Sequence, residues 1–594
     1  MTVEKLITDH IDIWPSALRT CSMAGRGSNG KIDLYGIKKL RELILELAVR
    51  GKLVPQDSND EPASELLKRI ATEKAELVKQ GKIKKQKPLP EISEDEKPFE
   101  LPEGWECARL GNTVAIIRGI TFPASEKHKE PSKGKIACLR TANVQDSIEW
   151  DDLLYVSESF VKRSEQFAEK GDIVMSMANS RELVGKVAHI YNIPTGSATF
   201  GGFLSVIRPY GFNAAFLMSV LRSPNIKSIL IDSSSQTTNI ANISLEKLNP
   251  LVISVPPIGE QNRIASKVEE LMSLCDQLER QSLTSLDAHQ QLVETLLATL
   301  TDSQNTEELT ANWARISQHF DTLFTTEASI DALKQTILQL AVMGKLVPQD
   351  PNDEPASELL KRIEQEKAQL VKEGKIKKQK TLPPISEDEK PFGLPDGWEW
   401  TTMQGLYPEF QNGLSSRGSS SGKDSVVIRL ADIKNWKVSF ADTRAIAITD
   451  SEKQKYCLDK NDILIVRVNG SADIVGGFVL YDDDQNVCYC DHFIRLRLPY
   501  KRVIDENYLI LVASSPLIRR KINNLFITTS GQKTVNQTHI SSLLFPLPPY
   551  KEQKCIVARV NELFSLCEQL KLRLQSAHQT QLNLADALTD AALN

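Results

Sequence analysis

The sequence predicts an α+β protein with an internal pseudo-twofold duplication, in which two compact α/β domains are joined by long helices. Three observations predict this fold. One segment of the chain occurs twice, apolar residues after each Pro-Pro pair follow a heptad spacing, and strand-like runs fill the stretches between the repeats. The chain has 594 residues, which is enough for several domains.

The duplication is clearest in its first segment. Residues 40–105 begin LRELILELAVRGKLVPQDSNDEPASELLKRI and end LPEGW, whereas residues 333–398 begin LKQTILQLAVMGKLVPQDPNDEPASELLKRI and end LPDGW. The two segments align over 66 positions without a gap and differ at 14 of them. A second pair follows, because the PPIGEQ motif at Pro256 matches PPYKEQ at Pro548. A period near 290 residues is too long for a solenoid, so it indicates a duplicated half-molecule.

The repeats divide the chain into five parts. These are an N-terminal region with the first conserved repeat (1–105), a first variable block (106–257), central conserved helices with the second repeat (258–398), a second variable block (399–549) and a C-terminal conserved helix (550–594). The two blocks differ almost throughout, although both keep an Asp-Ile pair, at Asp172 and at Asp462. A shared scaffold with different surfaces suggests two similar domains that face two different targets.

The segments that follow the Pro-Pro pairs are predicted to be long helices. Their apolar residues are spaced by four and three positions, which is the seam of a coiled coil. The seam consists of Ile264, Val268, Leu271, Cys275 and Leu278 in the first copy and of Ile556, Val560, Leu563, Cys567, Leu570 and Leu574 in the second. Other helices are expected from Ile37 to near Gly51, and over 63–80 and 356–373 after caps at Asn59-Asp60 and Asn352-Asp353.

The variable blocks have the pattern of α+β domains. Short helices are expected at 216–221 and 508–512. Strands are expected where apolar and β-branched residues run together between turn residues, at 114–117, 173–175, 203–207, 426–428, 463–466 and 493–496.

Composition and charge exclude several classes of protein. The chain carries 72 Lys+Arg and 77 Asp+Glu, a net charge of -5, which argues against non-specific coating of nucleic acid. Each variable block carries +2, which leaves -9 for the remaining residues. The sequence has no run of 18 or more apolar residues, so no membrane span is predicted. Nine unpatterned cysteines and an N-terminus unlike a signal peptide favour a cytoplasmic protein with reduced thiols.

Three motifs resemble catalytic or metal sites, and each is interpreted as structural. The sequence LPPY at 547–550 has leucine where amino-methyltransferases need a polar side chain. The segment 418–424 lacks the spacing and the Ser/Thr of a P-loop. The segment CYCDH at 488–492 has no second ligand cluster at a usual spacing, so it is interpreted as a strand with buried thiols. We therefore expect no catalytic residue and no metal site.

The order of repeats and variable blocks resembles that of the specificity subunits of type I restriction-modification systems. The resemblance covers nearly the whole chain and is carried by the PP-x-x-EQ motifs at Pro256 and Pro548 and by the Asp172 and Asp462 segments. The LAVRGKLVPQD and LAVMGKLVPQD repeats, each continued by SELLKRI, resemble the B group of that family in particular.

The resemblance implies that each variable block is a target-recognition domain for one half of a bipartite, asymmetric DNA site. The conserved helices would pair as an antiparallel coiled coil, set the distance between the domains and dock two modification subunits. These partners would use S-adenosylmethionine to methylate adenine, and restriction subunits would use ATP and Mg to translocate and cleave double-stranded DNA. The chain itself would bind no cofactor and catalyse no reaction.

Base readout needs Arg, Lys, Asn, Gln, Ser or Thr on loops that reach base edges. Such residues lie at the ends of strand-like runs or in Gly/Ser-rich loops of both blocks. The DNA-binding candidates are Arg118, Thr121, Arg140, Asn143, Asn179, Ser180, Arg181, Gln236, Thr237 and Asn239 in the first block, and Arg417, Lys423, Arg429, Arg467, Asn469, Ser471, Gln532, Lys533 and Asn536 in the second.

Two other functions are weighed beside this one. The chain could be an adenine methyltransferase that acts alone, which predicts methyl transfer by the purified chain. It could also be a helical scaffold whose domains bind proteins, which predicts no sequence-specific protection of DNA.

Overall fold

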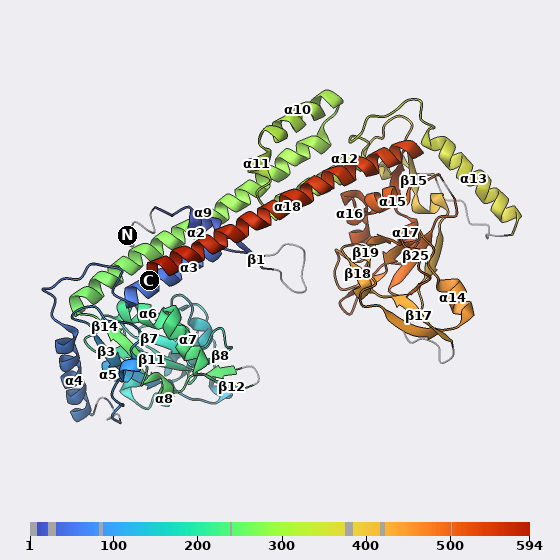
Figure 1. The fold of residues 1–594 in the computed structure, drawn as a ribbon. Helices are drawn as coiled ribbons and strands as arrows, with labels where there is room; N and C mark the ends of the chain where they lie inside the picture. Colours follow the sequence, from blue (N-terminus) through green and yellow to red (C-terminus); the bar gives the residue numbers. More distant parts are fainter. Residues whose placement is uncertain are drawn as a thin grey trace. The chain divides into compact units, whose positions relative to one another are not determined.

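The computed structural model describes residues 9–21, 31–81, 83, 87–237, 240–374, 384–415, 422–500 and 502–593. The chain forms two compact units (Figure 1). Unit 1 comprises Met1–Arg19, Leu34–Leu283 and Gln579–Asn594, and unit 2 comprises Thr20–Asp33 and Thr284–His578. Both units contain helices and sheets, so the predicted mixed α and β class is confirmed.

The first variable block is built on a four-stranded antiparallel sheet of order β4-β11-β7-β9. Three smaller sheets have the orders β10-β5-β6, β12-β13-β8 and β14-β3. The strands are β3 (Glu106–Arg109), β4 (Val114–Arg118), β5 (Lys135–Leu139), β6 (Leu154–Ser157), β7 (Ile173–Ser176), β8 (Ala178–Asn179), β9 (Val187–His189), β10 (Ala198–Phe200), β11 (Leu204–Pro209), β12 (Ser235–Thr237), β13 (Ile240–Asn242) and β14 (Val252–Val255).

Every sheet of the first block has a counterpart in the second. The orders there are β16-β25-β21-β23, β20-β17-β24, β22-β27-β26 and β15-β28, with one extra hairpin, β18-β19. The strands are β15 (Glu399–Thr402), β16 (Glu409–Asn412), β17 (Lys423–Ile428), β18 (Ile433–Lys434), β19 (Lys437–Val438), β20 (Arg444–Ile448), β21 (Ile463–Val466), β22 (Val468–Asn469), β23 (Phe478–Leu480), β24 (Cys488–Tyr489), β25 (Phe493–Arg497), β26 (Ile527–Thr529), β27 (Gln532–Thr534) and β28 (Leu544–Leu547). The six predicted strands lie in these sheets.

The helices also repeat between the copies. The first copy contains α2 (Ile13–Ser16), α3 (Tyr35–Val49), α4 (Ala63–Lys79), α5 (Leu110–Thr113), α6 (Ala214–Arg222), α7 (Pro224–Asp232), α8 (Leu245–Leu248) and α9 (Ile258–Asp302). The second contains α10 (Thr306–Gln318), α11 (Phe320–Leu323), α12 (Glu327–Val342), α13 (Ala356–Lys372), α14 (Asp450–Tyr456), α15 (Glu506–Ser514), α16 (Pro516–Leu525), α17 (Gln537–Ser541) and α18 (Tyr550–Leu593). A two-stranded sheet of β1 (Arg19–Cys21) and β2 (Lys31–Asp33) precedes α3.

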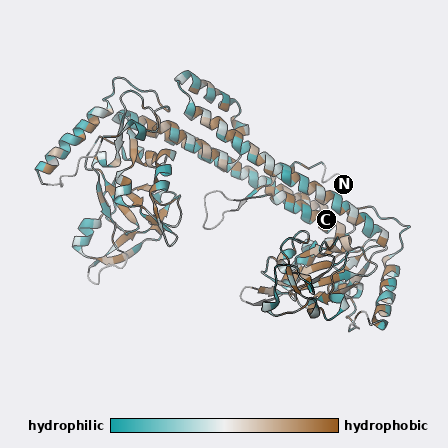
Figure 2. Cartoon of the chain, turned by 180° about the vertical axis from the view of Figure 1, so that it is seen from behind, coloured by the Kyte–Doolittle hydropathy of each residue, from teal (hydrophilic) through white to brown (hydrophobic). Residues whose placement is uncertain are grey.

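The predicted helical seam lies in the core of each unit. In unit 1, the start of α9, the helix α3 and the end of α18 share one apolar cluster. In unit 2, the start of α18, the helix α12 and the end of α9 share the equivalent cluster. In Figure 2, the strands of both blocks are mostly hydrophobic, whereas α9 and α18 alternate between hydrophobic and hydrophilic residues. The spacing therefore predicted correctly which face of each long helix is buried.

The repeated lysine of the GKLVPQD motif binds the C-terminal end of a long helix in each unit. Lys52 donates from Nζ to the carbonyl oxygen of Leu593 at 2.8 Å. Lys345 donates to the carbonyl oxygens of Thr301 and Ser303, both at 2.8 Å. The last carbonyls of a helix have no partner within the helix and carry partial negative charge, so an ammonium group stabilises them.

The expected caps of the two charged helices are wrong. The residues before α4 and α13 are Pro62 and Pro355, and neither helix has a side-chain cap. The Asp side chains instead make other contacts, because Asp60 pairs with Arg263 at 2.7 Å and Asp353 pairs with Lys551 at 3.0 Å. Among the described residues, no helix combines the length and the apolar character that crossing a membrane requires.

Candidate nucleic-acid interface

The Asp-Ile pair shared by the blocks positions the central strands of the four-stranded sheets. Asp172, just before β7, accepts from Arg208 Nε at 2.7 Å and from Nη2 at 2.8 Å. It also accepts the backbone N–H of Glu169 at 2.7 Å. Asp462 forms the same bidentate pair with Arg497. Both carboxylates are buried, and burial of a charged group is favourable only with such hydrogen-bonded partners.

A three-stranded sheet follows the end of β7 and of β21 in each block and contains many of the candidate residues. We call β12-β13-β8 the first small sheet and β26-β27-β22 the second small sheet. Their registers are equivalent, since Asn179 lies opposite Ala241 and Asn469 lies opposite Lys533. The candidates that these sheets and their turns bring together are Asn179, Ser180, Arg181, Gln236 and Thr237 in the first block, and Asn469, Ser471, Gln532 and Lys533 in the second.

The charged groups of the small sheets are exposed and weakly paired. Arg181 lies 3.8 Å from Asp232, and both side chains are largely exposed, so this pair contributes little to stability. Lys533 donates to the carbonyl oxygen of Gly470 at 2.8 Å and lies over the Phe526 ring. These cations can exchange such contacts for a phosphate or a base edge at small cost.

Asn179 and Asn469 shape the turns that follow them. The side-chain oxygen of Asn179 accepts from the N–H of Ser180 at 2.9 Å, and that of Asn469 accepts from the N–H of Ser471 at 2.8 Å. Such bonds are typical of Asn in turns. Each bond uses one of the two lone pairs of the side-chain oxygen, so it holds the amide group in the turn without preventing a contact with a base edge.

Equivalent loops follow β5 in the first block and β17 in the second. Arg140 and Asn143 stabilise the first loop, and Arg429 stabilises the second. Asn143 is 2% exposed, and it accepts from the N–H of Arg140 and donates to the carbonyls of Glu149 and Asp152. The expectation that Asn143 faces DNA is therefore corrected: its side chain is buried because it supplies the hydrogen bonds that close this loop. Arg140 pairs with Asp152 at 2.7 Å, and Arg429 pairs with Asp432 at 2.9 Å.

The other candidates lie at several places. Arg118 and Thr121 are exposed at the end of β4 and just beyond it, and Arg467 directly precedes β22. Lys423 begins β17, six residues before Arg429, so these two lie at opposite ends of a strand. Asn536 caps α17 by accepting from the N–H of His539 at 2.8 Å. Asn239 and Arg417 lie outside the described residues. Contact of the exposed candidates with DNA stays a prediction.

Two turns that the sequence did not indicate as part of a DNA interface lie beside the small sheets. We call residues 201–203 and 490–492 the first and second tip turns. The carbonyl of Phe203 accepts from the N–H of Met177 at 2.9 Å, and that of His492 accepts from the N–H of Arg467 at 2.7 Å. Phe203 is 70% exposed, although it was expected inside a strand. The preceding Gly201-Gly202 pair was the signal for a turn at this point.

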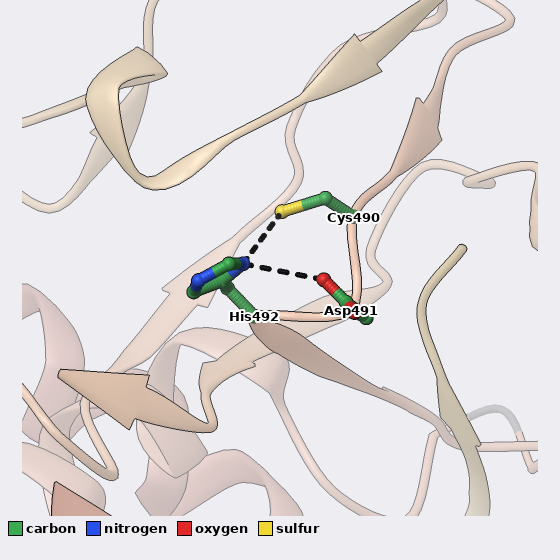
Figure 3. Close-up of side chains that lie close together, drawn as sticks. All are labelled: Cys490, Asp491 and His492. Atoms are coloured by element: carbon green, nitrogen blue, oxygen red, sulfur yellow. Dashed lines mark hydrogen bonds and ion pairs between the residues drawn. The ribbon is translucent and has the colours of Figure 1, made fainter. Parts of the chain in front are cut away.

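The second tip turn contains a cluster of possible metal ligands (Figure 3). The Sγ of Cys490 lies 3.8 Å from Nδ1 of His492, and that nitrogen lies 3.3 Å from a carboxylate oxygen of Asp491. Three ligands from consecutive residues are fewer than the four of a structural zinc site. Burial raises the pKa of the Cys490 thiol to about 11. We therefore interpret this cluster as a set of contacts that orient the His492 ring.

The PP-x-x-EQ motifs fix each block to its long helix. Glu260 accepts from Trp105 Nε1 at 2.9 Å, and Glu552 accepts from Trp398 Nε1 at 2.9 Å. The neighbouring Gln261 and Gln553 accept the backbone N–H groups of Asn213 and Asp505, at 2.9 and 2.7 Å. The tryptophans belong to the LPEGW and LPDGW motifs. Two repeated motifs thus meet in space and form one clamp in each copy.

Comparison with known proteins identifies relatives of the whole chain. A family model for the type I restriction modification DNA specificity domain matches residues 102–288 and 424–576. The chain is 49% identical over 611 residues to the type I restriction enzyme EcoEI specificity subunit of Escherichia coli, and 50% identical over 611 residues to the EcoAI specificity subunit of the same species. Both alignments cover 100% of each chain. A solved chain of a type I R-M system aligns with a TM-score of 0.48 at 17% identity, over 84% of this chain and 99% of the other.

Proposed function

The chain belongs to the family of type I restriction-modification specificity subunits, and from that premise we propose that each variable block reads one half of a bipartite, asymmetric DNA site. The observation that carries this proposal is the equivalence of the two small sheets. They have the same strand order and register, yet they present different side chains at matching positions. Equal scaffolds with unequal surfaces suit two different half-sites.

The long helices are proposed to hold the two blocks at a fixed spacing as an antiparallel coiled coil. The helix α9 has 45 residues and α18 has 44. At 1.5 Å per residue each helix is about 66 Å long, which exceeds the 34–36 Å of one DNA turn. The core clusters support the antiparallel pairing, because each joins the start of one long helix to the end of the other.

The chain is proposed to choose the DNA while partner subunits provide the chemistry. Two modification subunits would bind S-adenosylmethionine and methylate the site, and restriction subunits would use ATP and Mg for cleavage. The weak positive charge of each block, +2, supports a division of labour, because phosphate contacts supply much of the affinity for DNA. Contacts from the partners would then supply much of the binding energy.

Footprinting of the assembled complex on DNA tests this function. We expect two protected half-sites separated by a fixed gap, at a position that depends on sequence. Purified chain without its partners should transfer no methyl group from S-adenosylmethionine to DNA. Methyl transfer by the chain alone would favour an independent methyltransferase, and absence of sequence-specific protection would favour a scaffold that binds proteins.

A further inference from the structure

The first tip turn presents one apolar side chain from a rigid backbone. The N–H of Gly201 donates to the carbonyl of Leu139 at 2.9 Å, and the N–H of Leu204 donates to the carbonyl of Gly201 at 2.8 Å. Together with the bond from Met177 to Phe203, these contacts hold both sides of the turn. The ring of Phe203 remains 70% exposed. A rigid backbone lowers the entropy that such a side chain loses when it binds a ligand.

Close packing at two glycines places each tip turn directly against the four-stranded sheet of its block. A Cβ on Gly119 would lie 2.2 Å from the carbonyl oxygen of Gly201, and one on Gly413 would lie 2.0 Å from that of Cys490. Only glycine allows the backbone at the end of β4 and of β16 to approach the turn this closely. Both blocks share this construction, but residue 203 is Phe and residue 492 is His.

Phe203 lies near an apolar methyl group, that of Thr121, and near the polar side chain of Arg118. A Cβ on Gly202 would lie 3.0 Å from Cγ2 of Thr121, so the methyl group of Thr121 lies against the first tip turn. Arg118 is exposed at the end of β4 and pairs in register with Ser205, two residues after Phe203. Met177, which bonds to Phe203, directly precedes β8 of the first small sheet. The backbone of the first tip turn is therefore hydrogen-bonded to the residue from which the first small sheet begins.

We propose that Phe203 is a specificity-determining residue that contacts the C5 methyl group of a thymine in the half-site read by the first block. In the major groove, only thymine offers a methyl group, and Phe and the Thr methyl are among the side chains that recognise it. The second tip turn presents His492 at the equivalent point, so the second block reads a different base edge there. This inference rests on the proposed function and deepens it.

A thymine-to-deoxyuridine scan tests the inference. The probe is a duplex that carries the site methylated in cells with this system, and each thymine of the first half-site is replaced in turn by deoxyuridine. Binding is measured with the full chain assembled with its modification subunits. One substitution should weaken binding about four-fold, which corresponds to about 0.8 kcal/mol for one buried methyl group. Phe203→Ala should bind the unmodified duplex more weakly and should not respond to that substitution.

Tyr191→Ala is the matched control for an exposed aromatic residue. Tyr191 is 65% exposed and follows β9 at the end of the sheet where His189 pairs with Ile173. Phe203 lies at the opposite end, where Leu204 pairs with Ser176. The Tyr191→Ala complex should keep the four-fold response. If Phe203→Ala does not assemble with the partners, Phe203→Leu replaces it and should reduce the response without abolishing it.

Two results would overturn the inference while leaving the proposed function intact. The first is a wild-type complex that loses no affinity at any thymine of the half-site, or a half-site without A·T pairs. The second is a Phe203→Ala complex that keeps the four-fold response. Failure of the proposed function is distinguishable, because the wild-type complex would then bind the site no better than a duplex of scrambled sequence.

Discussion

Removal of the clamp carboxylate is the perturbation that most directly tests how a block is fixed to its helix. Glu260→Ala removes the acceptor of the Trp105 Nε1–H bond. Both residues are buried, so the indole N–H is left without a partner. Glu260→Gln retains an oxygen at the same place and is the matched control. The second copy offers an internal comparison, because Glu552 also accepts from Gln349 Nε2 at 3.1 Å.

The expected cost follows from the number of donors that lose a partner. One buried donor without an acceptor costs about 1–3 kcal/mol. Local opening near Trp105 should therefore become about 5- to 150-fold more frequent in Glu260→Ala. Glu552→Ala should cost slightly more, because two donors lose their acceptor, although Gln349 is exposed and can bind water instead. Glu260→Gln should cost less than about 1 kcal/mol.

Hydrogen exchange of peptides that cover β3 and β14 measures the opening of the first clamp. These strands pair next to Trp105, with Glu106 opposite Val255. Exchange should accelerate in Glu260→Ala and remain near the wild-type rate in Glu260→Gln, whereas β15 and β28 of the second block should not change in either variant. Equal acceleration in Glu260→Ala and Glu260→Gln, or none in Glu260→Ala, would refute the clamp.

Three further predictions concern the same framework. Burial raises the pKa of the Glu260 carboxyl above its ordinary value of 4.5, so the folded state binds this proton more tightly than the unfolded state does. The free energy of unfolding should therefore decrease as the pH rises above about 4.5. Glu260→Gln should flatten this part of the curve of stability against pH, and an unchanged slope in the variant would contradict the prediction. Asp172→Asn should destabilise the first block by about 2–3 kcal/mol, which is less than the 3–5 kcal/mol for a broken buried ion pair, because Arg208 keeps its bonds to Glu169 and Phe167. Limited proteolysis should then show earlier cleavage in the first block only. Asp462→Asn should instead accelerate cleavage in the second block only. Lys345→Met should reduce the stability of the end of α9 by about 0.3–1 kcal/mol, so amide hydrogen exchange in the last turn of that helix should accelerate. Exchange of this turn at the wild-type rate would show that the ammonium group does not stabilise it.

The sequence predicted the parts of the fold that depend on local pattern. Heptad spacing predicted the buried face of α9 at Ile264 and Val268, because side-chain direction in a helix follows sequence spacing directly. Short runs of aliphatic residues between turns predicted β7 and β21, because such runs are typical of strands that are buried on both faces. The duplication also predicted that the two blocks share one architecture.

The candidate interface was harder to predict because it depends on contacts between distant residues. The first small sheet joins residues 178–179 to residues 235–242, and no local pattern encodes that pairing. Asn143 was misplaced because an Asn in a polar loop has the same sequence signature whether it faces solvent or closes the loop. Phe203 was missed because an aromatic residue at the start of an apolar run resembles a core residue.

The clamps show a different limit of sequence reasoning. The Glu of each PP-x-x-EQ motif lies in the first turn of a long helix, where an acidic side chain has a local stabilising effect. In the structure it binds a tryptophan 155 positions away in the first copy and 154 in the second. The duplication contained the clue, since both motifs are repeated together, but their contact required the tertiary structure.

Exchange of one variable block tests the central claim most directly. Residues 106–257 are replaced by the equivalent block of a relative with a different site, and the methylated motif is then sequenced in DNA from cells that carry the hybrid and its partner subunits. We predict that one half-site changes while the other half-site and the gap between them stay the same. A change in both half-sites, or an unchanged motif, would contradict the claim that each block reads its own half of the site.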